Sequence, residues 1–169
     1  MTTFVTSGQA YPSLTTTFAS GTIPPVAVGT EVFCSDGSVA MFVQATSTIA
    51  QYNFCIIINT SSATGASIGC VPVTTTNAAT SQRLCVAQTA ITSGDYGWVM
   101  LSGNNLRGNL AVACEPAVPL YTTATAGVLD DAKVTAGYCL GVVAMSSATS
   151  ASSPPIVMGQ AVIRTWGGG

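Results

Sequence analysis

The chain has 169 residues, of which 48% are hydrophobic and only 6% are charged, and its formal net charge is −2. A chain of this length suits one domain. Its charged fraction is far below that of a typical soluble protein, in which roughly a quarter of the residues are charged. No stretch approaches the roughly 18 consecutive apolar residues of a membrane-spanning helix, so we expect no membrane partner. The cations are scattered and offer no electrostatic footprint for nucleic acid, which we exclude as a partner: Arg83, Arg107, Lys133 and Arg164.

The scarcity of charge also bears on how the chain exists in solution. Its solvent-facing positions have to be filled mainly by Thr, Ser, Asn and Gln, which give little of the repulsion that keeps proteins apart. We therefore expect a subunit of an assembly, with a secreted, Thr-rich monomer as the alternative. The first residues, MTTFVTSGQAYP, lack the positive start and continuous apolar stretch of a secretory signal, so we expect no export by that route.

Residues 1–29 are predicted to form an extended N-terminal arm. They are rich in Thr, Ser, Gly and Pro, and the consecutive prolines of SGTIPPVAVG disfavour a helix. A disordered terminus is the alternative, but the arm is more apolar than a solvated tail needs. We therefore expect it to dock on its own body or on a neighbour. Together with Trp166 near the chain end, its apolar residues form the candidate partner interface: Phe4, Val5, Tyr11, Leu14, Phe18 and Ile23.

Residues 30–166 are predicted to form a β-rich body, followed by a flexible tail at 167–169. Many short β-prone runs separated by turn signals indicate an all-β, single-domain β-barrel or β-sandwich. The first is a hairpin over residues 31–45, in which Asp36 and Gly37 suit a two-residue turn. Helical candidates are scarce, and TSTIAQ and DDAKVTAG offer one turn each. Further strands are predicted near 52–59, 66–73, 83–91, 96–102, 109–115, 118–122, 138–145 and 156–165.

The strand at 96–102 is apolar on both faces. Alternation places Tyr96, Trp98 and Met100 on one face and Val99 and Leu101 on the other. Such a strand is covered twice, once by the domain core and once by another sheet, the arm or another subunit. Its aromatic residues are therefore predicted to pack in the core.

The six cysteines, at positions 34, 55, 70, 85, 114 and 139, are predicted to be free and buried. Their even number would permit disulfides in a secreted protein, but each lies among apolar neighbours, as in NFCII and RLCVA. No C-x-x-C pair occurs and the chain has no histidine, so we expect no metal site and no cofactor.

No catalytic residues are predicted. Without histidine, the Ser-His-Asp and Cys-His arrangements are excluded, and Lys133 lacks the S-x-x-K spacing of a serine–lysine enzyme. Six carboxylates remain, and nothing in their spacing indicates a glycosidase pair. Asp130 and Asp131 would point to opposite faces of a strand, so a turn or cap is favoured over catalysis or metal binding. We expect a protein that is not an enzyme.

Three stretches in order resemble a group of small virion proteins of tailed bacteriophages. They are QRLCVAQTAITSGDYGWVMLSG, CEPAVPLYTTATAGVLDDA and GYCLGVVAM, and the resemblance covers about residues 82–145. It implies a β-rich decoration (cement) protein on the capsid exterior, made in the host bacterial cytoplasm, and it carries over no catalytic residues.

The expected partners are thus the major capsid protein and further copies of the chain, with a trimer favoured. Such a protein would bind the outer capsid surface and stabilise the shell by bridging capsomers. One alternative is a tail or connector ring component of the virion. The other is a carbohydrate-binding β module that would use Tyr96, Trp98 or Trp166 as a stacking platform.

Overall fold

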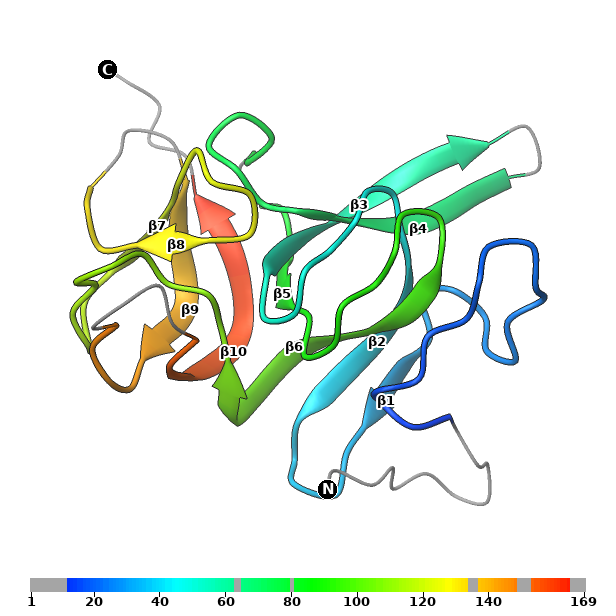
Figure 1. The fold of residues 1–169 in the computed structure, drawn as a ribbon, viewed down its shortest axis with the longest axis horizontal. Helices are drawn as coiled ribbons and strands as arrows, with labels where there is room; N and C mark the ends of the chain where they lie inside the picture. The colour runs from blue at the N-terminus through cyan, green and yellow to red at the C-terminus, as the bar shows by residue number, and fades with distance from the viewer. Residues whose placement is uncertain (1–11, 63–64, 80, 134–136, 149–152, 165–169) are drawn as a thin grey trace.

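The computed structural model of the chain describes residues 12–62, 65–79, 81–133, 137–148 and 153–164. These ranges contain strands and loops but no helix, and consequently no helix long and apolar enough to cross a membrane. The all-β, single-domain prediction is confirmed, and of the two predicted architectures the structure is a β-barrel (Figure 1). Its strands are β1 (Glu31–Phe33), β2 (Val39–Ala45), β3 (Phe54–Ser62), β4 (Gly65–Pro72), β5 (Leu84–Val86), β6 (Tyr96–Arg107), β7 (Leu120–Thr122), β8 (Leu129–Asp130), β9 (Tyr138–Ala144) and β10 (Pro155–Arg164).

Five strands close the barrel, in the order β2, β4, β3, β5 and β6, with β6 returning to β2. The closure includes one parallel contact, in which Gln44 and Ala45 of β2 pair with Gly69 and Cys70 of β4. The other neighbours are antiparallel. β-branched and aromatic residues, such as the isoleucines of β3, favour this pleated and buried environment.

The hairpin of β1 and β2 forms where it was predicted, but its turn is one residue longer. Gly37 N donates to Cys34 O at 3.0 Å and Cys34 N donates to Ser38 O at 2.8 Å. Gly37 has a φ of +80°, whereas Asp36 is not among the residues with a positive φ. A two-residue type I′ turn needs positive φ at both central positions, so the chain instead makes a three-residue loop over 35–37.

The two faces of the barrel strands belong to two hydrophobic clusters. The interior cluster contains one face of all five strands and residues of two loops, which the bridge between Ile49 and Ile91 joins: Met41, Val43, Ala45, Ile49, Cys55, Cys70, Cys85, Ala87, Ile91, Val99 and Leu101. These residues are buried although no other element of the described chain joins the cluster, so they fill the barrel. The outer cluster takes the opposite face, including Phe42, Phe54, Trp98 and Met100, and extends into the second sheet and the arm.

β6 confirms the prediction of a strand apolar on both faces. Trp98 and Met100 belong to the outer cluster, with Tyr96 packed against it, and Val99 and Leu101 belong to the interior cluster. Both covers are therefore supplied by the chain itself. The burial of this strand requires no second subunit.

A second sheet extends from the far half of β6. Its strand order is β6, β10, β9, β7 and β8, and these strands lie on one side of the barrel in Figure 1. The ring of Phe54 links it to the barrel, because the ring occupies the space that a side chain at Gly108 would need, next to Ile156 of β10. Glycine at position 108 thus allows the close approach of β3 and the segment after β6.

The described part of the arm, residues 12–29, lies on its own body. Phe18 and Tyr96 exchange two backbone hydrogen bonds of 2.9 and 2.8 Å. The Phe18 ring also contacts Phe42 edge-on, with centroids 6.0 Å apart. Leu14 and Val28 pack against the outer cluster. The arm was predicted to dock on its own body or on a neighbour, and these contacts are made with its own body.

Two local predictions were wrong. Residues 109–115 are not a strand, because Leu110 makes only an isolated bridge to Leu129 and the chain then turns, with Ala113 at a φ of 68°. The segment changes neighbour at this turn, because Ala111 N donates to Leu129 O whereas Ala113 N donates to Ala148 O, so no single strand pairs along it. The one-turn helix considered at TSTIAQ does not form, because Ile49 in this stretch makes a β-bridge to Ile91. In DDAKVTAG, Asp130 ends β8, and residues 134–136 lie outside the described residues.

Candidate functional site

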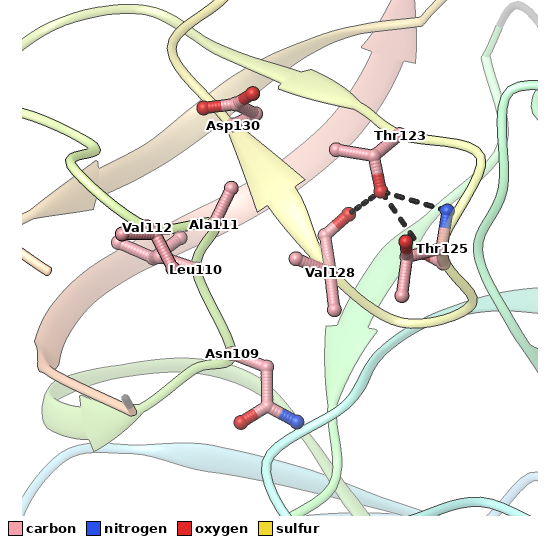
Figure 2. A pocket seen from close by; sticks show the side chains of 8 residues that line it. All are labelled: Asn109, Leu110, Ala111, Val112, Thr123, Thr125, Val128 and Asp130. Atoms are coloured by element: carbon pink, nitrogen blue, oxygen red, sulfur yellow. Dashed lines mark hydrogen bonds between the residues drawn. The ribbon is translucent and has the colours of Figure 1, made fainter. Parts of the chain in front are cut away.

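An open pocket of about 500 Å³ lies between the segment after β6 and the loop that joins β7 to β8. Figure 2 shows Leu110, Ala111 and Val112 facing Thr123, Thr125 and Val128 across it, with Asn109 and Asp130 at its two ends. Most of these side chains come from the loops at 109–113 and 123–128. The turns of these two loops therefore determine the shape of the pocket. Asp130 is the only charged group among the described residues that line it.

Most hydrogen-bonding capacity in this pocket is used to hold its own loops. Thr123 Oγ1 lies 3.0 Å from the carbonyl oxygens of Thr125 and Val128 and accepts a bond from Thr125 N at 3.1 Å. Asn109 Nδ2 donates to Asn53 Oδ1 at 2.9 Å and to Gln51 O at 3.1 Å. Polar groups engaged in this way anchor the loops and have little capacity left for a ligand.

Next to the pocket, Cys114, Asp130 and Asp131 bring their ligand atoms within 4.8 Å of one another. On a strand the two carboxylates would point to opposite faces, and the sequence favoured a turn or cap instead. Asp131 lies beyond the end of β8, where the alternation no longer applies. Each carboxylate also binds backbone, because Asp131 Oδ2 accepts from Glu115 N and Asp130 Oδ1 accepts from Asp131 N, both at 2.9 Å.

The chemistry of this cluster is limited by the thiol. Burial, and then the negative charges of Asp131 and Asp130, raise the pKa of Cys114 to about 11. The thiol is therefore protonated at neutral pH, when it is neither a good nucleophile nor a metal ligand. These three residues would hold a divalent cation only after losing that proton, and the contacts they already make are those of a turn.

Three of the other four carboxylates of the described chain also have structural contacts. Glu31 forms an ion pair with Arg83, with 2.7 Å between Oε1 and Nη1. Asp36 Oδ1 accepts from Ser38 N at 3.0 Å within the first hairpin. Asp95 Oδ1 accepts from Ser20 N at 2.8 Å and ties the arm to the start of β6.

The residues of the candidate partner interface are dispersed. Leu14 and Phe18 pack on the outer cluster of their own chain, whereas Ile23 is 97% exposed. Phe4, Val5, Tyr11 and Trp166 lie outside the described residues, as does the tail at 167–169. Of these positions, Ile23 is the described one that offers a large apolar surface to a neighbour.

Sequence reasoning missed several exposed apolar side chains. Phe33 on β1 is 65% exposed, Val112 in the pocket rim is 62% exposed and Met145 after β9 is 58% exposed. Phe33 stands between buried Val32 and Cys34, so alternation could have placed it on the opposite face from them. The arm and the second sheet determine which of the two faces is exposed to solvent. The local sequence pattern does not predict this exposure.

A second groove, of about 470 Å³, runs between the start of the described arm and β6. Ser13, Leu14 and Thr15 form one wall, and the side chains of Trp98, Met100 and Leu106 form part of the other. Trp98 is 2% exposed and is a packing residue here. Tyr96 stacks on Phe42 with 6.3 Å between ring centroids.

The chain matches no family model, no curated protein and no solved structure.

Proposed function

We propose that this chain is a decoration (cement) protein of a tailed bacteriophage, which binds the outer capsid surface and stabilises the shell by bridging capsomers. The observation that supports it best is the combination of a nearly uncharged surface with isolated large apolar side chains, such as Ile23, Phe33 and Met145. A surface of this kind presents little electrostatic repulsion to close neighbours. The proposal includes no catalysis, in keeping with carboxylates that serve turns and ion pairs.

A projecting ribbon gives the molecule reach beyond its barrel. β3 and β4 pair along their whole length, from Cys55 with Pro72 to Ser62 with Gly65. Only Phe54–Ile56 of β3 also pair with β5, and only Gly69 and Cys70 of β4 with β2. In Figure 1 the remainder extends away from the body, at the opposite end from the second sheet. A ribbon that projects in this way suits contact with a neighbouring subunit.

The mechanism follows from repetition and mass action. A protein that binds only the assembled shell lowers the free energy of that state, and the shell becomes harder to disrupt. Many copies that each make modest contacts also act together through multivalency. Assembly into a trimer would place the chain at local three-fold positions, where one copy can touch several capsomers.

The experiment uses expanded shells of a phage that carries this gene, prepared without the protein. We expect the full chain to saturate these shells and to raise the temperature at which they disrupt. Removing residues 1–11 should lower occupancy, because Phe4, Val5 and Tyr11 belong to the predicted interface. A deletion of 1–29 would be uninformative, since Phe18 and Val26 pack on the body.

Ile23→Ser provides the matched variant inside the described arm. The Ile23 side chain is exposed, so its replacement should change the stability of the fold little. We expect reduced occupancy with an unchanged unfolding temperature of the free protein. Unchanged occupancy after removal of residues 1–11 would contradict the role of the arm. Failure of the full chain to bind the shells would contradict the function.

A further inference from the structure

Three cysteines from three neighbouring strands meet inside the barrel. Cys55 of β3, Cys70 of β4 and Cys85 of β5 are completely buried in the interior cluster. The sulfur atoms of Cys70 and Cys85 lie 3.7 Å apart. The Cys55 thiol donates to Asn53 O at 3.5 Å and the Cys85 thiol to Cys55 O at 3.4 Å. The thiols are thus close together and held by backbone acceptors.

The register of the strands nevertheless opposes a disulfide between Cys55 and Cys85. These residues face each other across β3 and β5. The bonds from Ile57 N to Arg83 O and from Ala87 N to Asn53 O, each 3.0 Å, lie two residues to either side, so Cys55 and Cys85 form a hydrogen-bonded pair. In such pairs the Cβ atoms stand about 5.5 Å apart, whereas a disulfide needs roughly 3.5–4.5 Å.

Cys70 is placed even less favourably for a disulfide. It pairs with Ile57, so it stands diagonal to Cys55, and diagonal Cα atoms are about 7–8 Å apart. Cys85 lies on the other side of β3 from Cys70, which separates their Cα atoms further. Cysteines whose Cα atoms are more than about 7 Å apart cannot be bridged without backbone movement. The short distance between the sulfurs arises because both side chains reach across the interior over β3.

We infer that the closed barrel accepts Cys55, Cys70 and Cys85 only as free thiols, so that a disulfide between any two of them, formed before closure, prevents folding. The three lie at even spacing along the chain, and the loops of about 15 residues between them close readily in the unfolded state. The cluster is then a redox-sensitive device in the fold: reduced chains close the barrel and oxidised chains are held open. It does not depend on the proposed function.

The chemistry needs a small-molecule disulfide such as oxidised glutathione. A cysteine thiolate attacks one glutathione sulfur and releases the other glutathione as a thiol. A second protein thiolate then attacks the cysteine sulfur of the mixed disulfide and releases the remaining glutathione. In total two protein thiols are oxidised to one disulfide, and one oxidised glutathione is reduced to two thiols, which take up the two protons.

Closure of the barrel protects the cluster from this reaction. Burial raises the pKa of Cys55 and Cys85, and hydrogen bonds from these two lower the pKa of Cys70. Two of the three sulfurs are therefore protonated and unreactive at neutral pH, and the interior excludes glutathione from all three. Oxidation of the folded protein has to proceed through its rare unfolded molecules.

The test uses a variant in which the other cysteines are removed: Cys34→Ala, Cys114→Ala and Cys139→Ala. Oxidised glutathione is added to the folded variant and to the variant in urea, and disulfide formation is followed by the mass of the alkylated chain. Because the folded protein reacts through an unfolded fraction of about 10⁻³ or less, we expect it to oxidise at least about 1,000-fold more slowly.

The urea-oxidised variant is then diluted into native buffer, and we expect no native near-ultraviolet circular dichroism until a reductant is added. Recovery on reduction is the control for chemical damage. The unsubstituted chain provides the same comparison if the variant folds poorly, with disulfides located by peptide mapping. Fast oxidation of the folded protein with an unchanged spectrum would overturn the inference, and so would refolding of a chain that contains a disulfide within the cluster.

Discussion

The interior and outer clusters are built from opposite faces of the same five strands, yet they are filled by different side chains. The described interior cluster contains aliphatic side chains up to the size of Met41 and Leu101 and three cysteines but no aromatic ring, whereas the outer face has the rings of Phe42, Phe54 and Trp98. A closed barrel of few strands has a narrow lumen, and these smaller side chains fill it without an aromatic ring. The outer face has to span the distance to the second sheet and the arm.

This difference shows what each apolar face of a strand contributes. The interior cluster closes the barrel on itself and fixes its curvature. The outer cluster joins the barrel to everything else, so its aromatic rings determine whether the second sheet and the arm stay in place. The following predictions probe these two roles, beginning with the largest expected effect.

Phe54→Ala removes the ring that joins the two sheets. Its burial is complete, and it fills the space beside Gly108 and Ile156. Truncating a buried phenylalanine costs about 3–5 kcal/mol, so we expect a loss of this size in the free energy of unfolding, with one cooperative transition. Urea unfolding followed by circular dichroism measures it. Two separate transitions would show that the second sheet folds independently of the barrel.

Ala87→Leu overfills the barrel. Ala87 is completely buried in the interior cluster, whereas Ala90 in the same loop is exposed. Adding methylene groups to a well-packed core costs typically 1–3 kcal/mol, and the narrow lumen places the expected loss at about 3 kcal/mol. Ala90→Leu is the matched control and should change the thermal midpoint little. Equal effects of the two substitutions would contradict the interior position of Ala87.

Cys139, a member of the outer cluster, should destabilise the protein at alkaline pH. Burial raises its pKa from 9.0 to about 12. The folded-state pKa exceeds the unfolded one, so the stabilisation is fully present below pH 9 and is lost as the pH rises towards 12. Between pH 8 and pH 10.5 this thiol should account for about 2 kcal/mol of lost unfolding free energy.

The measurement for Cys139 is urea unfolding at both pH values, in reducing buffer. Between these pH values, Cys139→Ala should lose about 2 kcal/mol less unfolding free energy than the unsubstituted chain. The remaining thiols and tyrosines contribute equally to both proteins. A pH dependence identical to that of the unsubstituted chain would mean that Cys139 is accessible to solvent.

The ion pair of Glu31 and Arg83 should matter least. It joins β1 to the residue that precedes β5, and both side chains are more than one third exposed. Exposed pairs contribute about 0–1 kcal/mol, and salt screens them. Glu31→Gln should therefore shift the urea midpoint only slightly at low salt and not at all in 1 M salt. A large shift that persists in salt would indicate that Glu31 holds β1 in place by another contact.

Much of the barrel is predictable because its signals are local. Alternation placed the five aromatic and aliphatic side chains of β6 on the correct faces, and the residues at 36 and 37 marked the first hairpin. Local chemistry did not give the length of that turn, since a three-residue loop also accepts Asp followed by a glycine with positive φ.

The second sheet is harder to predict because its short elements depend on tertiary contacts. β8 has two residues and exists through its pairing with β7, and Leu110 bridges to Leu129 without forming a strand. No periodicity is measurable over such lengths. The proximity of Cys114, Asp130 and Asp131 has the same origin, because it requires the turn at 111–114 to fold against the end of β8.

In the proposed function, the chain acts through repeated contacts with copies of itself and with a shell. The most direct measurement is the native mass of the purified protein in reducing buffer at micromolar concentration. The account predicts a discrete trimer, which suits a cement protein seated at local three-fold positions. A ring of six or more copies would contradict the capsid position and favour a tail or connector, and a stable monomer would contradict self-assembly altogether.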